Sequence, residues 1–434
     1  MSFEELKLHP NLLKGIRDLG FIRPTPIQKE AIPPILAGRD VIGCAQTGTG
    51  KTAAFVLPIL DRLLKSPKSP FARALIIAPT RELALQSMEH LRSLSRHVHL
   101  KGAAIFGGVP IDPQKQAIKN GVDIISATPG RLLDLIYQGL MNFGAVEVLV
   151  LDEADRMLDM GFLPDVQRIL SMLPEKRQNL IFSATMPPDI LKLVHQILHN
   201  PVTVQIGQRS SPPVGIRHAI YPVAHHLKTD LLVHLLRGMS MPSVLVFTRT
   251  KHRADRLFRS LERQSFKVSV LHGDRSQNQR LSALDRFRRG RSQVMVATDI
   301  AARGIDIEDI SHVINFDMPH VTEDYVHRIG RTGRAEATGD AFSLVSPDEE
   351  EIVRDIQRVL SMQLPRVMLP DFNYKKAKPP KPGGVRPGGG HGHGFGNSRG
   401  HSVVSPGGHS SGSQHGMRNS RPPVPSWGRT PKKA

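Results

Sequence analysis

The chain has 434 residues, which is enough for two domains of ordinary size and a substantial further segment. Apolar residues make up 39% of the sequence, and no apolar run approaches the roughly 18 residues that a membrane-spanning helix needs. The start, MSFEELKLHP, has acidic residues where a secretory signal peptide has basic ones. Cys44 is the single cysteine, which excludes an internal disulfide and favours a protein of the reducing cytoplasm.

The formal charge of +19 is distributed unevenly along the chain. Residues 373–434 contain eleven Lys and Arg and no Asp or Glu, which leaves +8 for the preceding 372 residues. Such a basic arm can bind nucleic acid, bind another anionic surface or serve solubility alone. From residue 371 onward Gly, Pro and His are frequent and apolar side chains are too few for a core, so we expect residues 371–434 to form a disordered tail.

Two groups of β-branched apolar runs alternate with helical patterns, which predicts two α/β domains with parallel sheets. The runs are apolar on both faces, as expected for strands that helices cover on both sides. The first group comprises residues 40–45, 74–79, 102–107, 122–128, 146–153 and 178–185, and the second comprises residues 243–248, 267–273, 292–299, 311–317 and 339–346. The Gly/Pro/Ser-rich segment between the groups predicts domains at residues 1–207 and 216–370, joined by a linker at 208–215.

Several predicted strands end in short polar or glycine-containing motifs, at the edge where open α/β sheets bind ligands. Residues 45–52, AQTGTGKT, follow one such strand and precede an apolar helix, which is the context of a phosphate-binding P-loop. Lys51 is expected to meet the β and γ phosphates, and the Thr52 hydroxyl to ligate Mg²⁺. Ala45 stands where the strict pattern has glycine, and a glycine-rich turn without function is the alternative interpretation. The nucleotide-binding residues of this loop are predicted to be Thr47, Gly48, Thr49, Gly50, Lys51 and Thr52.

An acidic motif, Asp152-Glu153-Ala154-Asp155, ends the apolar run that begins at residue 146. A carboxylate at the end of a buried strand is the second half of a P-loop site. Asp152 is therefore expected to hold Mg²⁺, and Glu153 to orient and deprotonate the attacking water. The alternative is the acidic first turn of a helix, which the helix macrodipole would favour in any case.

With these two motifs in this order, the chain resembles the DEAD-box RNA helicases over about residues 3–370. The resemblance implies two tandem RecA-like domains that use ATP and Mg²⁺ to unwind short RNA duplexes locally or to remodel ribonucleoproteins. Residues 20–28 are similar to the adenine-reading Q motif of that family, with Phe3 at the expected distance upstream. The Gln28 amide can donate to and accept from the edge of adenine. Phe3 or Phe21 packs either on the base or in the core.

Further motifs of the family supply the remaining candidate residues. By resemblance, RNA contacts fall on Thr80, Arg81, Gly108, Thr128 and Arg131 in the first domain and on Thr248, Thr298 and Arg303 in the second. The segment around Thr80 also fits a plain helix cap. Coupling between hydrolysis and RNA is assigned to Ser183, Thr185 and His327, although Ser183-Ala184-Thr185 alone is an ordinary helix cap.

The resemblance assigns the ATP ribose to Asp306 and arginine fingers on the γ-phosphate to Arg331 and Arg334. A solvated arginine-rich surface is the alternative for the two arginines. Because the nucleotide site and its arginines lie on different domains, ATP and RNA together are expected to close the cleft between them. RNA is expected to bind as single strand or short duplex, without sequence specificity.

The compact core and short basic tail most resemble bacterial RhlE-type members, whose partners would be ribonucleoproteins or the machineries of RNA degradation or ribosome assembly. Two other functions remain open. One is an ATP-gated RNA clamp with little unwinding, and the other is a DNA-stimulated helicase or ATPase of the same superfamily.

Overall fold

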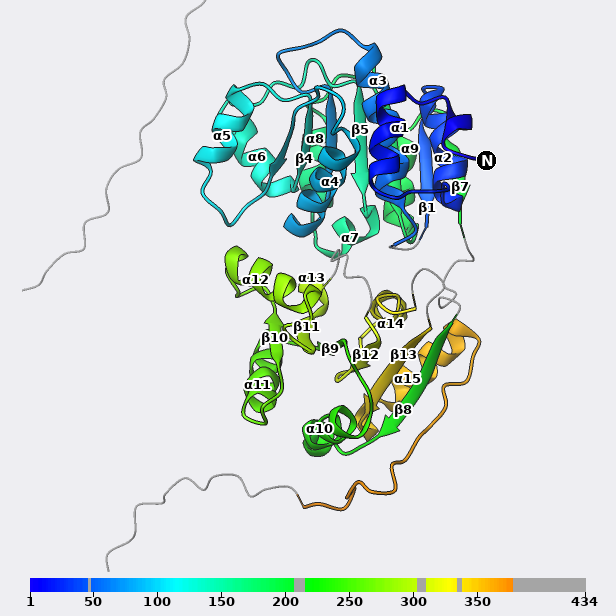
Figure 1. Ribbon diagram of the computed structural model, residues 1–434, viewed down its shortest axis with the longest axis vertical. Helices are drawn as coiled ribbons and strands as arrows, with labels where there is room; N and C mark the ends of the chain where they lie inside the picture. Colours follow the sequence, from blue (N-terminus) through cyan, green and yellow to red (C-terminus); the bar gives the residue numbers. More distant parts are fainter. Residues whose placement is uncertain (46–47, 207–214, 303–309, 334–337, 378–434) are drawn as a thin grey trace, which may run out of the picture. The chain divides into compact units, whose positions relative to one another are not determined.

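The computed structural model describes residues 1–377 except 46–47, 207–214, 303–309 and 334–337. The expected linker at 208–215 and the tail beyond Ala377 therefore lie almost entirely outside the described residues. The described residues form two parallel β-sheets, and helices cover both faces of each sheet (Figure 1). Each sheet with its helices is termed a domain below. The predicted fold class is confirmed.

The first domain is built on a seven-stranded parallel sheet with the order β3-β4-β2-β5-β6-β1-β7. Its strands are β1 (Val41–Cys44), β2 (Ala74–Ile77), β3 (Gly102–Ile105), β4 (Ile124–Ala127), β5 (Val148–Asp152), β6 (Gln178–Ser183) and β7 (Val202–Gln205). The helices are a 3-10 turn (Glu4–Leu6), α1 (Pro10–Asp18), α2 (Pro26–Leu36), α3 (Lys51–Lys65), α4 (Arg81–Leu94), α5 (Asp112–Lys119), α6 (Pro129–Tyr137), α7 (Ala154–Asp159), α8 (Leu163–Leu170) and α9 (Pro188–Ile197).

Alternate residues of these strands enter two separate cores, because successive strand side chains point to opposite faces of a sheet. Ile76 and Val150 pack with the helices α1 to α4. Leu75 and Leu149 pack with α6 to α9 on the other face. This burial on both faces explains why the central strands are continuously apolar.

The second domain is built on a six-stranded parallel sheet with the order β10-β11-β9-β12-β13-β8. Its strands are β8 (Ile216–Pro222), β9 (Val244–Thr248), β10 (Val268–Leu271), β11 (Val294–Thr298), β12 (His312–Asn315) and β13 (Gly339–Val345). The helices are α10 (Lys228–Gly238), α11 (Lys251–Glu262), α12 (Gln277–Arg288), α13 (Asp299–Ala302), α14 (Thr322–Ile329) and α15 (Glu350–Leu360), with 3-10 turns at His225–Leu227 and Pro347–Glu349.

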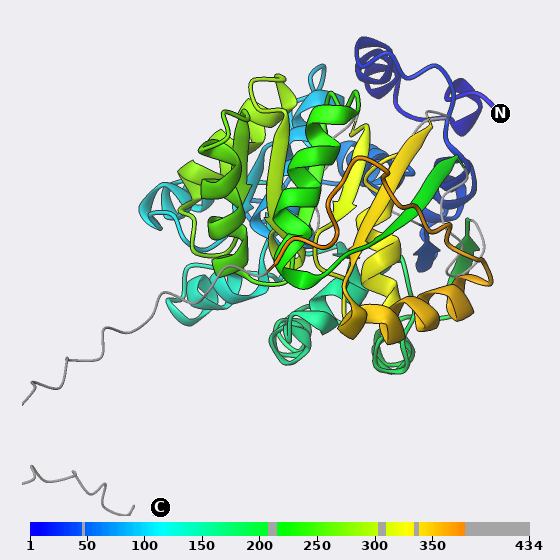
Figure 2. The same ribbon diagram turned by 90° about the horizontal axis from the view of Figure 1, so that it is seen from below.

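The stretch after α15 runs back across the second sheet, where it is drawn in orange in Figure 2. Arg366 forms a parallel bridge to Ile220 of β8, and Phe372 and Tyr374 pack on the core beneath α10 and α11. Contacts with the second domain thus continue past residue 370 as far as Lys376, which lies 2.6 Å from Asp230.

All eleven predicted strand segments contain a strand, whereas β7 and β8 were missed. Both are edge strands in which exposed residues interrupt the apolar pattern, so the signal of a strand buried on both faces is absent. In the part of the chain that the structure describes, no helix combines the length and hydropathy that a membrane span requires.

Candidate active site

The phosphate loop leads directly into α3, which begins at Lys51. Gly50 has a φ of 90°, and a Cβ there would lie 2.5 Å from the Gln28 Nε2 atom, so both the backbone angle and the space require glycine. The Lys51 ammonium is buried and donates to the Ala45 carbonyl at 2.8 Å. The N-terminus of α3 presents backbone N–H groups and a positive dipole end, which together favour a phosphate.

A cavity of about 270 Å³ adjoins this loop. Six predicted nucleotide-site residues line it together with both predicted catalytic carboxylates: Phe21, Gln28, Gly48, Gly50, Lys51, Thr52, Asp152 and Glu153. They come from segments as far apart as residues 21 and 153, and the carboxyl ends of β1 and β5 bring them together. The structure therefore brings these eight predicted residues together around one cavity in the first domain.

Asp152 and Glu153 are both 3% exposed at the end of β5. Burial, and next the neighbouring Glu153 charge, raise the pKa of Asp152 to about 7, against the opposing charge of Lys51. Among the described residues, the Asp152 Oδ1 atom is buried without a hydrogen-bond partner. Glu153 has a φ of 52°, in the left-handed region, and its carboxylate is bound by the buried guanidinium of Arg156.

These features fit a divalent cation. A buried carboxylate oxygen without a partner is costly unless a ligand satisfies it. Oxygen donors are the ligands that Mg²⁺ prefers, and the Thr52 hydroxyl lines the same cavity. Asp152 and Thr52 are thus the residues that would hold Mg²⁺.

The predicted adenine-reading residues are not equivalent in the structure. Gln28 lies in the first turn of α2, where its Oε1 accepts from Thr25 N at 3.0 Å and its Nε2 donates to the Gly50 carbonyl at 3.1 Å. It thereby ties α2 to the phosphate loop, and each amide group retains one further hydrogen-bonding position. Phe21 lines the cavity, whereas Phe3 is 2% exposed in the core. Phe21 is thus the phenylalanine placed to pack on a base.

Asp155 connects the acidic motif to residues 183–185. Its Oδ2 atom accepts from Ala184 N at 3.1 Å, from Thr185 N at 2.7 Å and from Thr185 Oγ1 at 2.9 Å. The Ser183 hydroxyl in turn accepts from Asp155 N at 3.1 Å. Burial opposes ionisation of Asp155, but the charges of Lys51 and Arg156 keep its pKa below the ordinary value. The end of β6 is thus locked to the start of α7 by four hydrogen bonds.

The predicted RNA contacts of the first domain gather beyond β2, β3 and β4, which are neighbouring strands. Thr80 and Thr128 stand at the N-caps of α4 and α6, and the Thr80 hydroxyl accepts from Leu83 N at 3.3 Å. Arg81 packs so closely on Gly108 that a side chain there would collide with its guanidinium. Arg131 donates to the Val109 carbonyl at 3.2 Å. The helix-cap interpretation of Thr80 is therefore correct. Arg81 and Arg131 are then the candidate RNA-binding side chains at this edge of the sheet.

In the second domain, Thr248 and Thr298 end the neighbouring strands β9 and β11. Thr248 is fully buried, and its hydroxyl donates to the Thr250 and Ala297 carbonyls at 3.4 Å. Thr250 is exposed at the N-cap of α11, and Thr298 is half-buried. At this strand end, Thr250 rather than Thr248 presents a hydroxyl to the surface.

The arginine-rich motif begins on α14 and continues past its end. His327 lies on α14, and Arg331, one residue beyond the helix cap, is 3% exposed; both line a small cavity of about 10 Å³. Four site predictions, Thr47, Arg303, Asp306 and Arg334, lie outside the described residues.

Two buried arginines were missed from the sequence. Arg156 forms an ion pair with Glu153, and the i, i+3 spacing of the two residues at the start of α7 could have indicated this pair. Arg328 forms ion pairs of 2.6 and 2.7 Å with Asp299 and lies 5.0 Å from the Phe247 ring centroid. Its partners are Asp299 at the start of α13, Asn315 of β12 and Phe247 of β9, so no local pattern could have separated it from the neighbouring arginines.

A phosphate loop at a helix N-terminus, with a buried carboxylate pair at the end of another parallel strand of the same sheet, defines the class of P-loop nucleotide hydrolases. Comparison with known proteins narrows this class. The DEAD/DEAH box helicase family model matches residues 25–193, and the helicase conserved C-terminal domain model matches residues 227–336.

The chain is 42% identical over 373 residues to the DEAD-box ATP-dependent RNA helicase CshA of Bacillus subtilis, covering 86% of this chain and 75% of that one. It is 41% identical over 372 residues to RhpA of Helicobacter pylori strain 26695, with the same coverage of 86% and 75%. The structure of S. cerevisiae Dbp5 bound to RNA and ADP BeF3 matches with a TM-score of 0.77 at 35% identity, covering 84% of this chain and 95% of that one. The chain therefore belongs to the DEAD-box family and is an ATP-dependent RNA helicase.

Proposed function

We propose that this helicase opens short RNA duplexes locally, with the residues of the first-domain cavity and the arginines after α14 acting on one ATP. The observation that carries this assignment is the buried, unpartnered Asp152 oxygen beside Lys51 and Glu153 in a cavity of about 270 Å³. Phe21 and Gln28 hold the base, and Lys51 with the α3 N-terminus holds the phosphates. Asp152 and Thr52 would hold Mg²⁺, which would supply positive charge to the phosphate oxygens when bound.

Glu153 orients the attacking water and accepts its proton, because its carboxylate faces the cavity while Arg156 fixes its position. Arg331 and Arg334 stabilise charge on the γ-phosphoryl group as it transfers. Asp306 binds the ribose. Catalysis then requires residues of both domains, so ATP and RNA favour the arrangement that brings them together.

RNA contacts are assigned to Arg81, Arg131 and Gly108 in the first domain and to Thr250, Thr298 and Arg303 in the second. Arginine side chains and N-cap positions bind phosphodiesters without reading bases, which supports RNA binding that is independent of sequence. We place the protein in the cytoplasm, with ribonucleoproteins as its substrates and the RhlE-type helicases as its nearest functional group.

The function is tested by comparing nucleic acids of equal length. RNA is expected to stimulate ATP hydrolysis well above DNA, and a short RNA duplex is expected to separate in the presence of ATP. Release rates of a labelled strand and phosphate release are measured in parallel. Equal stimulation by DNA would indicate a DNA-stimulated ATPase, and ATPase without strand release would indicate an RNA clamp.

Thr185 is expected to couple hydrolysis to strand release, because its hydroxyl and its N–H both bind Asp155 of the acidic motif. In Thr185→Ala one of the four hydrogen bonds is lost, at a cost of about 1 kcal/mol. We expect strand release to fall several-fold while RNA-stimulated ATPase changes less. Thr185→Ser keeps the hydroxyl and is the matched control. Equal losses of both activities in Thr185→Ala would refute a coupling role.

A further inference from the structure

The amino-terminal edge of the second sheet, opposite the edge that carries the helicase motifs, is strongly basic. Three neighbouring strands, β10, β11 and β9, begin there. Exposed cations lie on the ends of α11 and α12 and on the segments that lead into β10 and β11. They form a group termed the basic rim: Arg259, Arg263, Lys267, Arg286, Arg288, Arg289 and Arg291.

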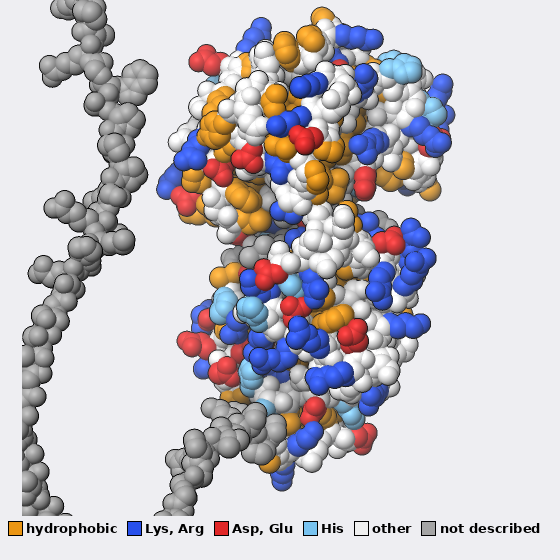
Figure 3. All heavy atoms as spheres, turned by 90° about the vertical axis from the view of Figure 1, so that its left-hand side faces the viewer, with side chains coloured by type: hydrophobic (Ala, Val, Ile, Leu, Met, Phe, Trp, Pro, Cys, Tyr) orange, Lys and Arg blue, Asp and Glu red, His pale blue; other side chains and the backbone are white. Residues whose placement is uncertain are grey.

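Backbone hydrogen bonds hold the segments of the rim side by side. Gln293 N donates to the Lys267 carbonyl at 2.8 Å, and Val244 N donates to the Gln293 carbonyl at 2.9 Å. Arg291 and Ser292 both donate to the Arg286 carbonyl. The cations that lead into β10 and those that lead into β11 therefore share one edge. Figure 3 faces the side of α11 and α12 and shows Lys and Arg side chains over much of the second domain.

The rim is more one-sided in charge than an ordinary solvated surface. The acidic side chains within its segments are Glu262 and Asp285, and Asp285 pairs with Arg289 at 2.8 Å. By contrast, α15 of the same domain carries Glu350, Glu351 and Asp355 against two arginines. Helix dipoles favour cations in the last turns of α11 and α12, but they do not account for Lys267 and Arg291, which lie outside both helices.

The exposed face of α11 connects the rim to the helicase edge. Arg256, Arg259 and Arg263 recur at helical spacing and are all exposed, and α11 begins beside Thr250 at the opposite end of the sheet. Twelve residues of helix at about 1.5 Å each span about 18 Å, which is the reach of a few nucleotides. Six of the seven rim cations are arginines, whose planar guanidinium groups bind phosphate through paired hydrogen bonds.

We propose that the basic rim is a second RNA-binding surface, which holds the phosphate backbone of the substrate beyond the segment gripped at the helicase motifs. It recognises single-stranded or duplex RNA by charge and not by sequence. Its effect is to retain long RNAs near the motor between cycles of ATP hydrolysis.

The test is carried out on the full chain with the triple variant Arg263→Gln/Lys267→Gln/Arg286→Gln. The matched control is Lys14→Gln/Lys68→Gln/Lys176→Gln, which removes the same charge from exposed positions of the first domain. Affinity is measured by fluorescence anisotropy over a range of salt concentrations, with single-stranded RNAs of about 8 and about 30 nucleotides. Thermal unfolding verifies that both variants are folded.

We expect the rim variant to bind the long RNA on the order of tenfold more weakly. The slope of log K plotted against log salt concentration should be shallower by about two, because three phosphate contacts are lost. Its affinity for the short RNA and its ATPase kcat with saturating short RNA should match those of the control. Equal weakening for both RNAs would overturn the proposal, because the rim would then belong to the motor track. Affinity for long RNA no lower than that of the control would also overturn it and would leave an acidic protein surface as the partner of the rim.

Discussion

Replacing Glu153 with glutamine is expected to lower the RNA-stimulated ATPase kcat by about 10²- to 10⁴-fold, the usual contribution of a general base. Glutamine preserves the length of the side chain and can still accept from the buried Arg156 guanidinium, so the local structure should persist. It cannot take a proton from water. Affinity for ATP should be retained because Lys51 and the α3 N-terminus, to which we assign phosphate binding, are unchanged.

The measurements are steady-state phosphate release and equilibrium binding of a fluorescent ATP analogue. Glu175→Gln, at an exposed position of the same domain, is the matched control and should retain normal turnover. We also expect Glu153→Gln to hold RNA longer than the wild type in the presence of ATP, because the bound ATP is no longer hydrolysed. ATP hydrolysis at the normal rate would show that Glu153 is not the base.

The grouping of the candidate nucleotide-site residues could be predicted from the sequence because they lie on strands and loops with strong local signals. The phosphate loop combines a buried strand, Gly50 at a positive φ and a helix that begins at Lys51, and each feature has its own sequence signature. The carboxylates follow a continuously apolar strand. Since the carboxyl ends of parallel strands share one edge, the strand pattern alone implies that these groups meet.

Side-chain direction at a strand end could not be predicted in the same way. Thr248 and Thr250 are two residues apart, yet one is fully buried and the other caps a helix at the surface. Which of them faces outward depends on where β9 stops and α11 begins, and element boundaries are the least certain part of a sequence-based prediction. The sequence likewise did not decide whether Phe3 packs on the base or in the core. Its 2% exposure depends on packing with distant residues of α2 and α3.

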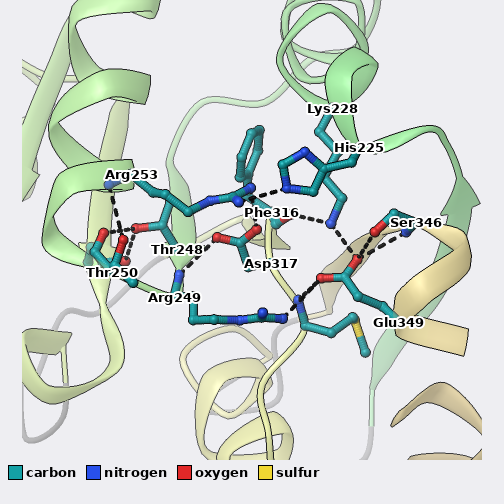
Figure 4. A network of polar contacts seen from close by, with 12 residues as sticks. His225, Lys228, Thr248, Arg249, Thr250, Arg253, Phe316, Asp317, Ser346 and Glu349 are labelled. Atoms are coloured by element: carbon teal, nitrogen blue, oxygen red, sulfur yellow. Dashed lines mark hydrogen bonds and ion pairs between the residues drawn. The ribbon is translucent and has the colours of Figure 1, made fainter. Parts of the chain in front are cut away.

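A buried ion pair in the second domain could not be predicted from the sequence, because its partners are 121 residues apart. Lys228 is 0% exposed, and its ammonium donates to the Glu349 carboxylate at 2.5 Å and to the Phe316 carbonyl at 2.9 Å (Figure 4). Glu349 also accepts from Ser346 N and Oγ and from Met318 N. These contacts tie the start of α10 to the ends of β12 and β13.

Lys228→Met is expected to destabilise the second domain by about 3 kcal/mol, the lower end of the usual cost of breaking a buried ion pair. It removes the nearer cation of the buried Glu349 carboxylate and leaves Arg249, whose guanidinium lies 3.5 Å away. The double variant Lys228→Met/Glu349→Gln should recover part of that loss. Arg358→Met, which removes one member of an exposed pair, is the matched control and should change stability little. Urea unfolding followed by circular dichroism measures the change, and hydrogen exchange in α10 and β13 assigns it to this domain.

The loss of stability in Lys228→Met should depend on pH in a definite direction. Burial favours the neutral acid, but the Lys228 charge and hydrogen bond prevail and hold the pKa of Glu349 below its ordinary value of 4.5. In the wild type this carboxylate therefore stabilises the fold above pH 4.5, and that contribution disappears as the pH falls through the lowered pKa. In Lys228→Met burial is opposed only by Arg249 and by the hydrogen bonds from Ser346 and Met318, so the pKa of Glu349 in the folded state should be higher than in the wild type. The difference in unfolding free energy between the two proteins should thus be largest at neutral pH and shrink on acidification. A difference that stayed constant from pH 7 to below the ordinary glutamate value would show that the cost comes from packing and not from an uncompensated charge.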